Sequence, residues 1–521
     1  MANPLLEKWD GPFNMAPFDE ISDEHFEPAF EEALEAARAE VTAIAENPEK
    51  PSFANTIEAL EASGEQLDKV LSVFFTVSGS DSNPKRQKLQ RAFSPKLAAY
   101  SSEVTGNKEL FERIEALWKD RESLDLSDER QRLLMLTRRR FLRAGAALSG
   151  ESDKRMREIM GRLAELGTQF TQNLLADESG WYMELDEQAL ENIPEFVAAS
   201  AREAGREKGL DAPIITLSRS LIVPFLQFSP RRDLREKAFR AWEARGAMGG
   251  ETDNREICAE ILRLREERAQ LLGYESFAAY KLETEMAKTP DRVRDLLMQV
   301  WEPAKAQAER DAEVLTEMMQ ADGINGELRP WDWRYYAEKR RQAEHDLDEA
   351  AVKPYLSLEA MIEAAFGTAN RLFGLEFKEL DVPLYHPDCR AWEVSRNGSH
   401  IAVFIGDYFA RASKRSGAWC SAMRGQAKIP KTQGPVVLNT CNFAKGDPAL
   451  LSYDDARTLF HEFGHALHHL LSNVNYESIS GTSVARDFVE LPSQLYEHWL
   501  EVPEVLEKYA RHYQTGEAMP P

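Results

Sequence analysis

Apolar residues recur at three- and four-residue intervals through most of the first part of the chain, and this spacing predicts helices over most of residues 24–350. Segment 24–47 shows the pattern clearly. Its apolar positions are Phe26, Phe30, Leu34, Ala37, Val41 and Ile44. Such stripes are typical of helices that pack one face into a core. Turn-rich breaks at 148–153, 246–254 and 321–330 separate the helical stretches.

The pattern changes after about residue 375. Residues 400–410 ("HIAVFIGDYFA") and 434–443 ("GPVVLNTCNF") are short, β-branched runs bounded by Gly, Pro and Asn, so they are predicted to be strands. A helical pattern returns directly afterwards. We therefore expect a mainly α fold with a small β-sheet beside the helix that follows.

That helix contains "HEFGHALHH" at residues 461–469. Ser452 and Asp455 have the spacing of a capping box, which predicts a helix start near Ser452. At about 100° per residue, His465 and His468 fall within about 40° of His461, on one face. The opposite face is apolar. Its members are Leu459, Phe463, Ala466, Leu467 and Leu470.

Two histidines one helical turn apart suit two positions of a tetrahedral zinc site, so His461 and His465 are candidate ligands. Glu462 is rotated by one step and can take a proton from water beside the metal. His468 lies about 10 Å along the axis from His461, too far to share an ion with it. It and His469 are interpreted as surface or supporting residues. A chance match on a solvated helix is the simpler alternative, and the apolar opposite face disfavours it.

A zinc site needs a third protein ligand, and spacing alone does not select one. The candidates are Glu477, Asp487, Glu490 and Glu497. A second amphipathic helix is predicted in 485–500, with Pro492 near its first turn. Its expected apolar face is Phe488, Leu491, Leu495 and Trp499, with Tyr496 as a further member. Gln494 and Glu497 could orient a ligand, although a solvated position is the expected one.

Residues Asn439–Asn442 are candidate substrate-binding residues: Asn439, Thr440, Cys441 and Asn442. A peptide can bind by adding a strand to a sheet, so this predicted strand before the zinc helix could line a binding site. The alternative is an ordinary sheet strand. Cys441 is expected to be a small buried residue and no nucleophile, because no histidine partner is indicated near it. Lys414 and Arg415 could contact a peptide carboxylate, although a solvated position is the simpler interpretation.

Composition narrows the function classes. The formal net charge is −24, which argues against nucleic acid or an anionic membrane as partner. Four cysteines without a C-x-x-C pair indicate an intracellular protein with reduced thiols. Neither a secretory leader nor an apolar run of membrane-spanning length is present in the sequence, so a cytoplasmic location is expected.

Longer stretches carry a resemblance to a known family. "TLFHEFGHALHHLL" and "GTSVARDFVELPSQLYEHW" resemble the thimet oligopeptidase family of zinc peptidases, and within it the peptidyl-dipeptidase (dipeptidyl carboxypeptidase) branch. The resemblance extends over essentially the whole chain. It includes "NPLLEKWDGPFNMAPFDEISDEHFEPAF", "PSFANTIEALEASG" and "YARHYQTGEAMP".

The resemblance implies a site. His461, His465 and Glu490 would be the ligands of one Zn²⁺ per chain, and Glu462 the general base. Short unstructured peptides would be hydrolysed, with dipeptides released from a free C-terminus. Two alternatives stay open: an endo-acting oligopeptidase, or a non-catalytic peptide-binding or assembly subunit.

The resemblance also implies an architecture: an elongated, two-lobed helical body with a deep channel. Residues 1–350 would form one or more helical lobes along one channel wall. Residues 351–521 would form the N-terminal part of the zinc catalytic domain, which is incomplete relative to the family. A truncated gene product, a proteolytic fragment, or a split enzyme whose partner chain supplies the family's C-terminal segment would all fit this pattern.

Overall fold

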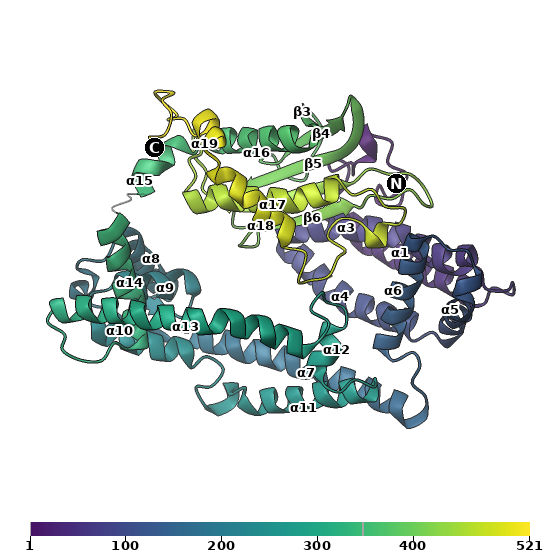
Figure 1. Cartoon of the computed structure of the whole chain (residues 1–521), viewed down its shortest axis with the longest axis horizontal. Helices are drawn as coiled ribbons and strands as arrows, with labels where there is room; N and C mark the ends of the chain where they lie inside the picture. Colours follow the sequence, from purple (N-terminus) through teal and green to yellow (C-terminus); the bar gives the residue numbers. More distant parts are fainter. Residues whose placement is uncertain (1, 346–348, 521) are drawn as a thin grey trace. The chain divides into compact units, whose positions relative to one another are not determined.

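The computed structural model describes residues 2–345 and 349–520 and is mostly helical, as expected (Figure 1). The chain divides into two compact units, one of residues 1–147 with 348–521 and the other of residues 148–347. The two units agree with the expected two lobes, and the channel stays a prediction. In the described part of the chain, no helix is long and apolar enough to cross a membrane.

The first unit begins with a bundle of helices and ends with a sheet covered by helices. The bundle comprises α1 (Asp23–Ala45), α2 (Ala59–Ala62), α3 (Glu65–Ser80), α4 (Pro84–Thr105), α5 (Lys108–Asp120) and α6 (Asp128–Ala144). The later helices are α15 (Glu349–Val352), α16 (Leu358–Phe373), α17 (Tyr453–Leu470), α18 (Leu491–Glu497) and α19 (Pro503–Tyr509). Short 3-10 or π segments are η1 (Pro12–Asn14), η2 (Phe53–Glu58), η3 (Arg121–Ser123), η6 (Lys353–Tyr355), η7 (Glu477–Ile479) and η8 (His498–Glu501).

The second unit is helical apart from a two-stranded ribbon. It comprises α7 (Gly150–Gly180), β1 (Tyr182–Glu184), η4 (Glu187–Leu190), α8 (Glu195–Glu207), β2 (Ile214–Thr216), α9 (Arg219–Phe228), α10 (Arg232–Glu243), η5 (Gly250–Thr252), α11 (Arg255–Leu271), α12 (Phe277–Leu282), α13 (Pro290–Ala321) and α14 (Pro330–His345). Asp332 is fully buried and accepts hydrogen bonds from Arg232 and Arg235 at 2.7 and 2.9 Å. This buried ion cluster joins α10 to α14.

The grouping of the first 147 residues with the C-terminal segment differs from the expected division at residue 350. Side chains of the N-terminal bundle bind the segment after α17. The Tyr476 hydroxyl is buried and donates to Glu58 at 2.7 Å, and Arg130 Nε donates to that hydroxyl at 3.1 Å. The backbone N–H of Asn475 donates to Glu129 at 2.6 Å. A helical pattern shared by both units carries no signal of these long-range contacts, so the sequence suggested one continuous helical region.

The five-stranded sheet of the first unit has the order β3-β4-β5-β7-β6. The strands are β3 (Leu375–Leu380), β4 (Arg390–Arg396), β5 (Ser399–Phe409), β6 (Trp419–Arg424) and β7 (Val436–Phe443). β5 and β7 pair in parallel, and the other neighbours are antiparallel. The two strands predicted from sequence are β5 and β7, and both predictions are confirmed. β7 is an inner strand, so β3 and β6 form the edges.

Helix α17 lies along one face of this sheet (Figure 1). Phe463 of α17 packs edge-to-face against Phe404 of β5, with ring centroids 5.2 Å apart. Its ring also lies 5.4 Å from that of Phe366 on α16. The apolar face predicted for α17 is buried in this core at every position. The sheet and α16 therefore hold one side of α17 fixed.

Candidate active site

Helix α17 starts where its capping residues predict. Ser452 precedes the helix, and its hydroxyl accepts the backbone N–H of Asp455 at 3.0 Å. The Asp455 carboxylate in turn accepts the backbone N–H of Ser452 at 3.2 Å. This capping box sets the register of the helix, and with its apolar face buried, His461 and His465 lie on the opposite side.

Three donor atoms converge beside α17. Glu490 Oε2 lies 3.3 Å from His461 Nε2 and 3.1 Å from His465 Nε2. All three ligand atoms lie within 4.8 Å of one another. Bonds of about 2.0–2.1 Å in a tetrahedral zinc site place neighbouring ligand atoms about 3.3 Å apart, so these spacings and this donor set fit zinc. Burial lowers the pKa of His465, which favours the neutral imidazole that binds metal.

Among the candidate third ligands, only Glu490 reaches the two histidines in the described part of the chain. Glu477 faces elsewhere: its carboxylate accepts the backbone N–H of Gly425 at 2.8 Å and the Gln433 amide at 2.9 Å. Asp487 is not part of the donor group. Of the alternatives that sequence spacing left open, the structure brings Glu490 to the two histidines, and its role as a zinc ligand stays a prediction.

Glu497 supports the site from the last residue of α18, about two turns beyond Glu490. Its Oε1 lies 2.6 Å from His461 Nδ1. An Nδ1–H that donates to this carboxylate leaves the Nε2 lone pair free to bind a metal and fixes the plane of the ring. The expectation of a solvated position is therefore wrong for Glu497, whereas Gln494 is exposed.

Glu462 is buried, with 6% of its surface exposed, and its Oε2 has no hydrogen-bond partner among the described residues. Burial raises its pKa to about 7; His461 acts to lower the pKa, and Glu490 acts to raise it. The carboxylate also contributes to raised thiol pKa values at Cys420 and Cys441, after the larger effect of burial. Glu462 follows His461 of the donor cluster on α17, a helix that packs against β6 and β7, and a carboxylate there could exchange protons with water.

α17 and α18 approach closely at Gly464. A Cβ at this position would lie 2.6 Å from Ser493 Cα and 2.9 Å from Tyr496 Cβ. The Ser493 hydroxyl lies 3.0 Å from Glu490 Oε2. The absence of a side chain at Gly464 therefore lets α18 come near enough for Glu490 to reach the histidines.

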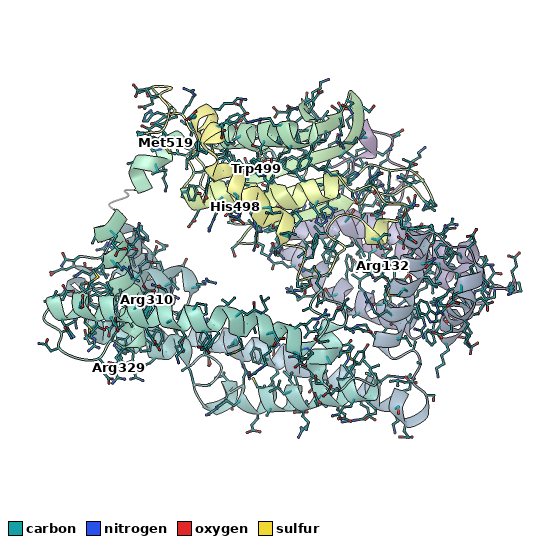
Figure 2. The ribbon with its side chains drawn as sticks, in the orientation of Figure 1. Arg132, Arg310, Arg329, His498, Trp499 and Met519 are labelled. Atoms are coloured by element: carbon teal, nitrogen blue, oxygen red, sulfur yellow. The ribbon has the colours of Figure 1, made fainter. Side chains whose placement is uncertain are left out.

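The apolar face predicted for the second helix is confirmed for Tyr496 and wrong for three other members. Leu491, Leu495 and Trp499 have exposed fractions of 47%, 55% and 36%. Figure 2 labels Trp499 in this part of the chain. The buried positions are Ser493, Tyr496 and Leu500. Tyr496 donates its hydroxyl to the carbonyl of Ala365 at 2.7 Å. Packing against Gly464 and α16 favours this narrower face over the more apolar one. Pro492 does lie in the first turn, as predicted.

The four candidate substrate-binding residues lie on β7, whose two edges are both paired. Thr440 is opposite Asp407 of β5 and opposite Trp419 of β6. Asn439, Thr440 and Cys441 are buried, and Cys441 is a free thiol whose pKa is raised by burial. A peptide therefore cannot add its backbone to β7, and the outer edge of β6 is the position for strand addition on this side of the sheet.

The side chain of Asn442 holds the β5–β6 loop (residues 410–418). Its Nδ2 donates to the carbonyls of Arg415 and Gly417 at 2.9 and 2.6 Å. Asn439 Oδ1 and Thr440 Oγ1 are buried with no hydrogen-bond partner in the described part of the chain. Substrate contact by residues 439–442 stays a prediction, and burial and these contacts leave their side chains little access to it.

Lys414, expected to be solvated or to contact a carboxylate, is fully buried. Its Nζ donates to Asp407 Oδ1 at 2.9 Å and to the carbonyl of Phe409 at 2.8 Å. Asp407 also accepts from Arg411 at 2.6 Å and from the Tyr385 hydroxyl at 2.6 Å. This buried cluster anchors the β5–β6 loop to β5. Sequence reasoning missed it because Asp407 lies in an otherwise apolar strand.

Of the two remaining motif histidines, His469 is buried and its Nε2 lies 3.0 Å from the hydroxyl of Thr482. Burial lowers its pKa to about 4, with smaller contributions from His468 and His465. His468 packs edge-on against Phe488, with ring centroids 6.3 Å apart. Neither belongs to the donor group, as predicted from their distance along the helix.

Glu497→Gln should weaken zinc affinity by about 10- to 100-fold, because removing the partner of a ligating histidine typically has this effect. Competition with a chromogenic chelator would measure the affinity. Gln494→Ala is the matched control, since Gln494 lies on the same helix and is exposed. An unchanged affinity in Glu497→Gln would show that the contact with His461 does not support metal binding.

Comparison with known proteins agrees with this geometry. Residues 225–521 match the model of peptidase family M3. The chain is 42% identical to dipeptidyl carboxypeptidase of Escherichia coli over 99% of this chain and 77% of that protein. It is 34% identical to oligopeptidase A of E. coli, over 100% of this chain and 78% of that protein. The chain therefore belongs to peptidase family M3 and is a metallopeptidase.

Proposed function

We propose that this chain is a zinc peptidase that releases dipeptides from the free C-terminus of short, unstructured peptides. The observation that carries the proposal is the convergence of His461, His465 and Glu490 beside a buried Glu462. The similarity to dipeptidyl carboxypeptidases supports release of dipeptides over internal cleavage.

In this proposal His461, His465 and Glu490 hold one Zn²⁺, and Glu497 keeps the His461 ring in position. The ion would supply Lewis-acid chemistry, polarising the peptide carbonyl and making water more acidic. Glu462 takes the proton from the attacking water and then delivers it to the leaving amine. Burial raises the pKa of Glu462 above its ordinary value, the direction that lets a carboxylate both take and return a proton near neutral pH.

The outer edge of β6 is the proposed binding surface for the peptide backbone. Cys420 of β6 pairs with Asn439, on the same face as Val437 and Cys441, which pack in the core with α17. The Glu462 carboxylate contributes to the raised pKa of the Cys420 thiol, after the larger effect of burial. Cys420 is the second residue of β6, so the start of the edge strand lies beside the proposed base. Recognition through main-chain hydrogen bonds tolerates many side chains, which suits a peptidase of broad specificity.

Mass spectrometry of an N-acetylated octapeptide incubated with the zinc-loaded chain tests the proposal. We expect products that shorten from the C-terminal end by two residues at a time. Internal cuts would instead favour an endo-acting oligopeptidase, the activity named for the oligopeptidase A relatives. An uncleaved peptide that still binds would favour a non-catalytic peptide-binding subunit.

A further inference from the structure

The β5–β6 loop (residues 410–418) is held in place from several sides. The backbone N–H of Arg415 donates to the carbonyl of Gly79 in α3 at 2.9 Å, and its carbonyl accepts from Asn442 at 2.9 Å. Ser82 N–H donates to the carbonyl of Ser413 at 2.6 Å. Lys414 is buried under the loop in its contact with Asp407. The backbone at Arg415 is therefore fixed at both its donor and its acceptor.

The Arg415 side chain is exposed above this fixed backbone. Its guanidinium lies over the ring of Trp419, 4.4 Å from the ring centroid, and it makes no ion pair with any residue that the structure describes. Trp419 pairs with Thr440 and lies close to Gly79, on the sheet face opposite α17. Stacking on an indole holds a guanidinium in one plane while its N–H groups stay available.

The direction of β6 determines which end of a bound peptide lies near the Arg415 guanidinium. β6 begins at Trp419, and the next residue, Cys420, pairs with Asn439 and packs in the core that contains α17. A peptide that adds antiparallel to β6 runs with its C-terminal end toward the start of the strand, and so toward the β5–β6 loop. Two residues of extended peptide span about 7 Å. A scissile bond beside Cys420 would therefore place the terminal carboxylate of a dipeptide near Ala418 and Gly417, where Arg415 is anchored.

We infer that Arg415 binds the free C-terminal carboxylate of the substrate peptide and thereby sets the release of dipeptides. The inference rests on the proposed function and names the side chain that recognises the C-terminus of the substrate. A guanidinium can bind a carboxylate through two parallel hydrogen bonds, which gives both affinity and a defined distance from the reacting bond. The fixed loop makes that distance constant.

The test compares a peptide acid with its C-terminal amide, in binding and in hydrolysis. Binding is measured by fluorescence anisotropy on the zinc-loaded Glu462→Gln chain, which needs no turnover. We expect the acid to bind about 10- to 100-fold more tightly than the amide, as one charge-assisted bidentate contact provides. Adding Arg415→Ala should bring the affinities for the acid and the amide within about threefold of each other. Arg415→Lys should restore part of the preference for the acid, because lysine keeps the positive charge but cannot form two parallel hydrogen bonds.

Arg91→Ala is the matched control, since Arg91 is exposed on α4 and makes no ion pair with any described residue; it should keep the preference for the acid. An acid preference that survives in Arg415→Ala, or no preference in the parent chain, would overturn the inference. Hydrolysis by chains with Glu462 intact separates the two proposals. Absence of cleavage together with an Arg415-dependent binding preference would contradict only the peptidase function, whereas dipeptide release from acid and amide alike would contradict only the role of Arg415.

Discussion

Glu462→Gln should lower peptide hydrolysis by about 10²- to 10⁴-fold, the usual contribution of a general acid–base group, while one zinc per chain is retained. Gln has nearly the same shape as Glu, and Glu462 is not among the three clustered donor atoms. Its carboxylate is buried with one oxygen unpaired, so a neutral amide should fit without loss of folding. Rates on an N-acetylated peptide and zinc content by atomic emission would be measured on the same preparation.

Glu507→Gln is the matched control, because Glu507 is exposed on α19. It should leave both the rate and the zinc content unchanged. Joint loss of zinc and activity in Glu462→Gln would assign Glu462 a structural role in the metal centre. Full activity with zinc retained would remove it from the proton transfer altogether.

Asp407→Asn should reduce the free energy of unfolding of the first unit by about 3–5 kcal/mol. The substitution leaves Lys414 and Arg411 buried without a counter-charge, and removing one partner of a buried ion pair typically has an effect of this size. The side chains of Asp407 and Lys414 are both fully buried, and that of Arg411 is 10% exposed. Urea unfolding followed by tryptophan fluorescence would measure the difference. Asp19→Asn, at an exposed position, is the matched control.

The difference in the free energy of unfolding between the parent chain and Asp407→Asn should depend on pH in one direction. Burial alone would raise the pKa of Asp407, but hydrogen bonds from Arg411, Tyr385 and Lys414 outweigh burial, and the net pKa is lowered. A carboxyl with a lowered pKa in the folded state stabilises fully above its unfolded value of about 3.9 and loses this contribution as the pH falls through the folded value. Parent and variant should therefore differ most near neutral pH and converge in acid. A difference that persists unchanged in acid would mean that the carboxylate charge is not what stabilises the cluster.

Local patterns predicted the parts of the site that lie within one helix. The capping box at Ser452 and the buried face of α17 follow from periodicity, and together they orient His461 and His465. The third ligand could not be selected in this way, because its position depends on the close approach of α18 at Gly464. The same packing explains why the more apolar side of α18 is exposed.

Contacts between segments far apart in the sequence account for the remaining differences. The role of Glu497 depends on its distance from His461 across two helices. The burial of Lys414 depends on a single aspartate in β5. The β6 strand carries little of the β-branched composition that made β5 and β7 recognisable. None of these contacts has a signature within a short window of sequence.

The two edges of the five-stranded sheet differ in a way that affects the behaviour of the protein in concentrated solution. β3 carries Glu376, Lys378 and Glu379, and charged residues on an edge strand oppose pairing with another chain. β6 has no charged residue from Trp419 to Met423. If the β6 edge binds peptides as proposed, it is equally open to an extended segment of another unfolded protein. Self-association and pairing with unfolded chains would then be hazards of the same edge, and a bound short peptide would block both.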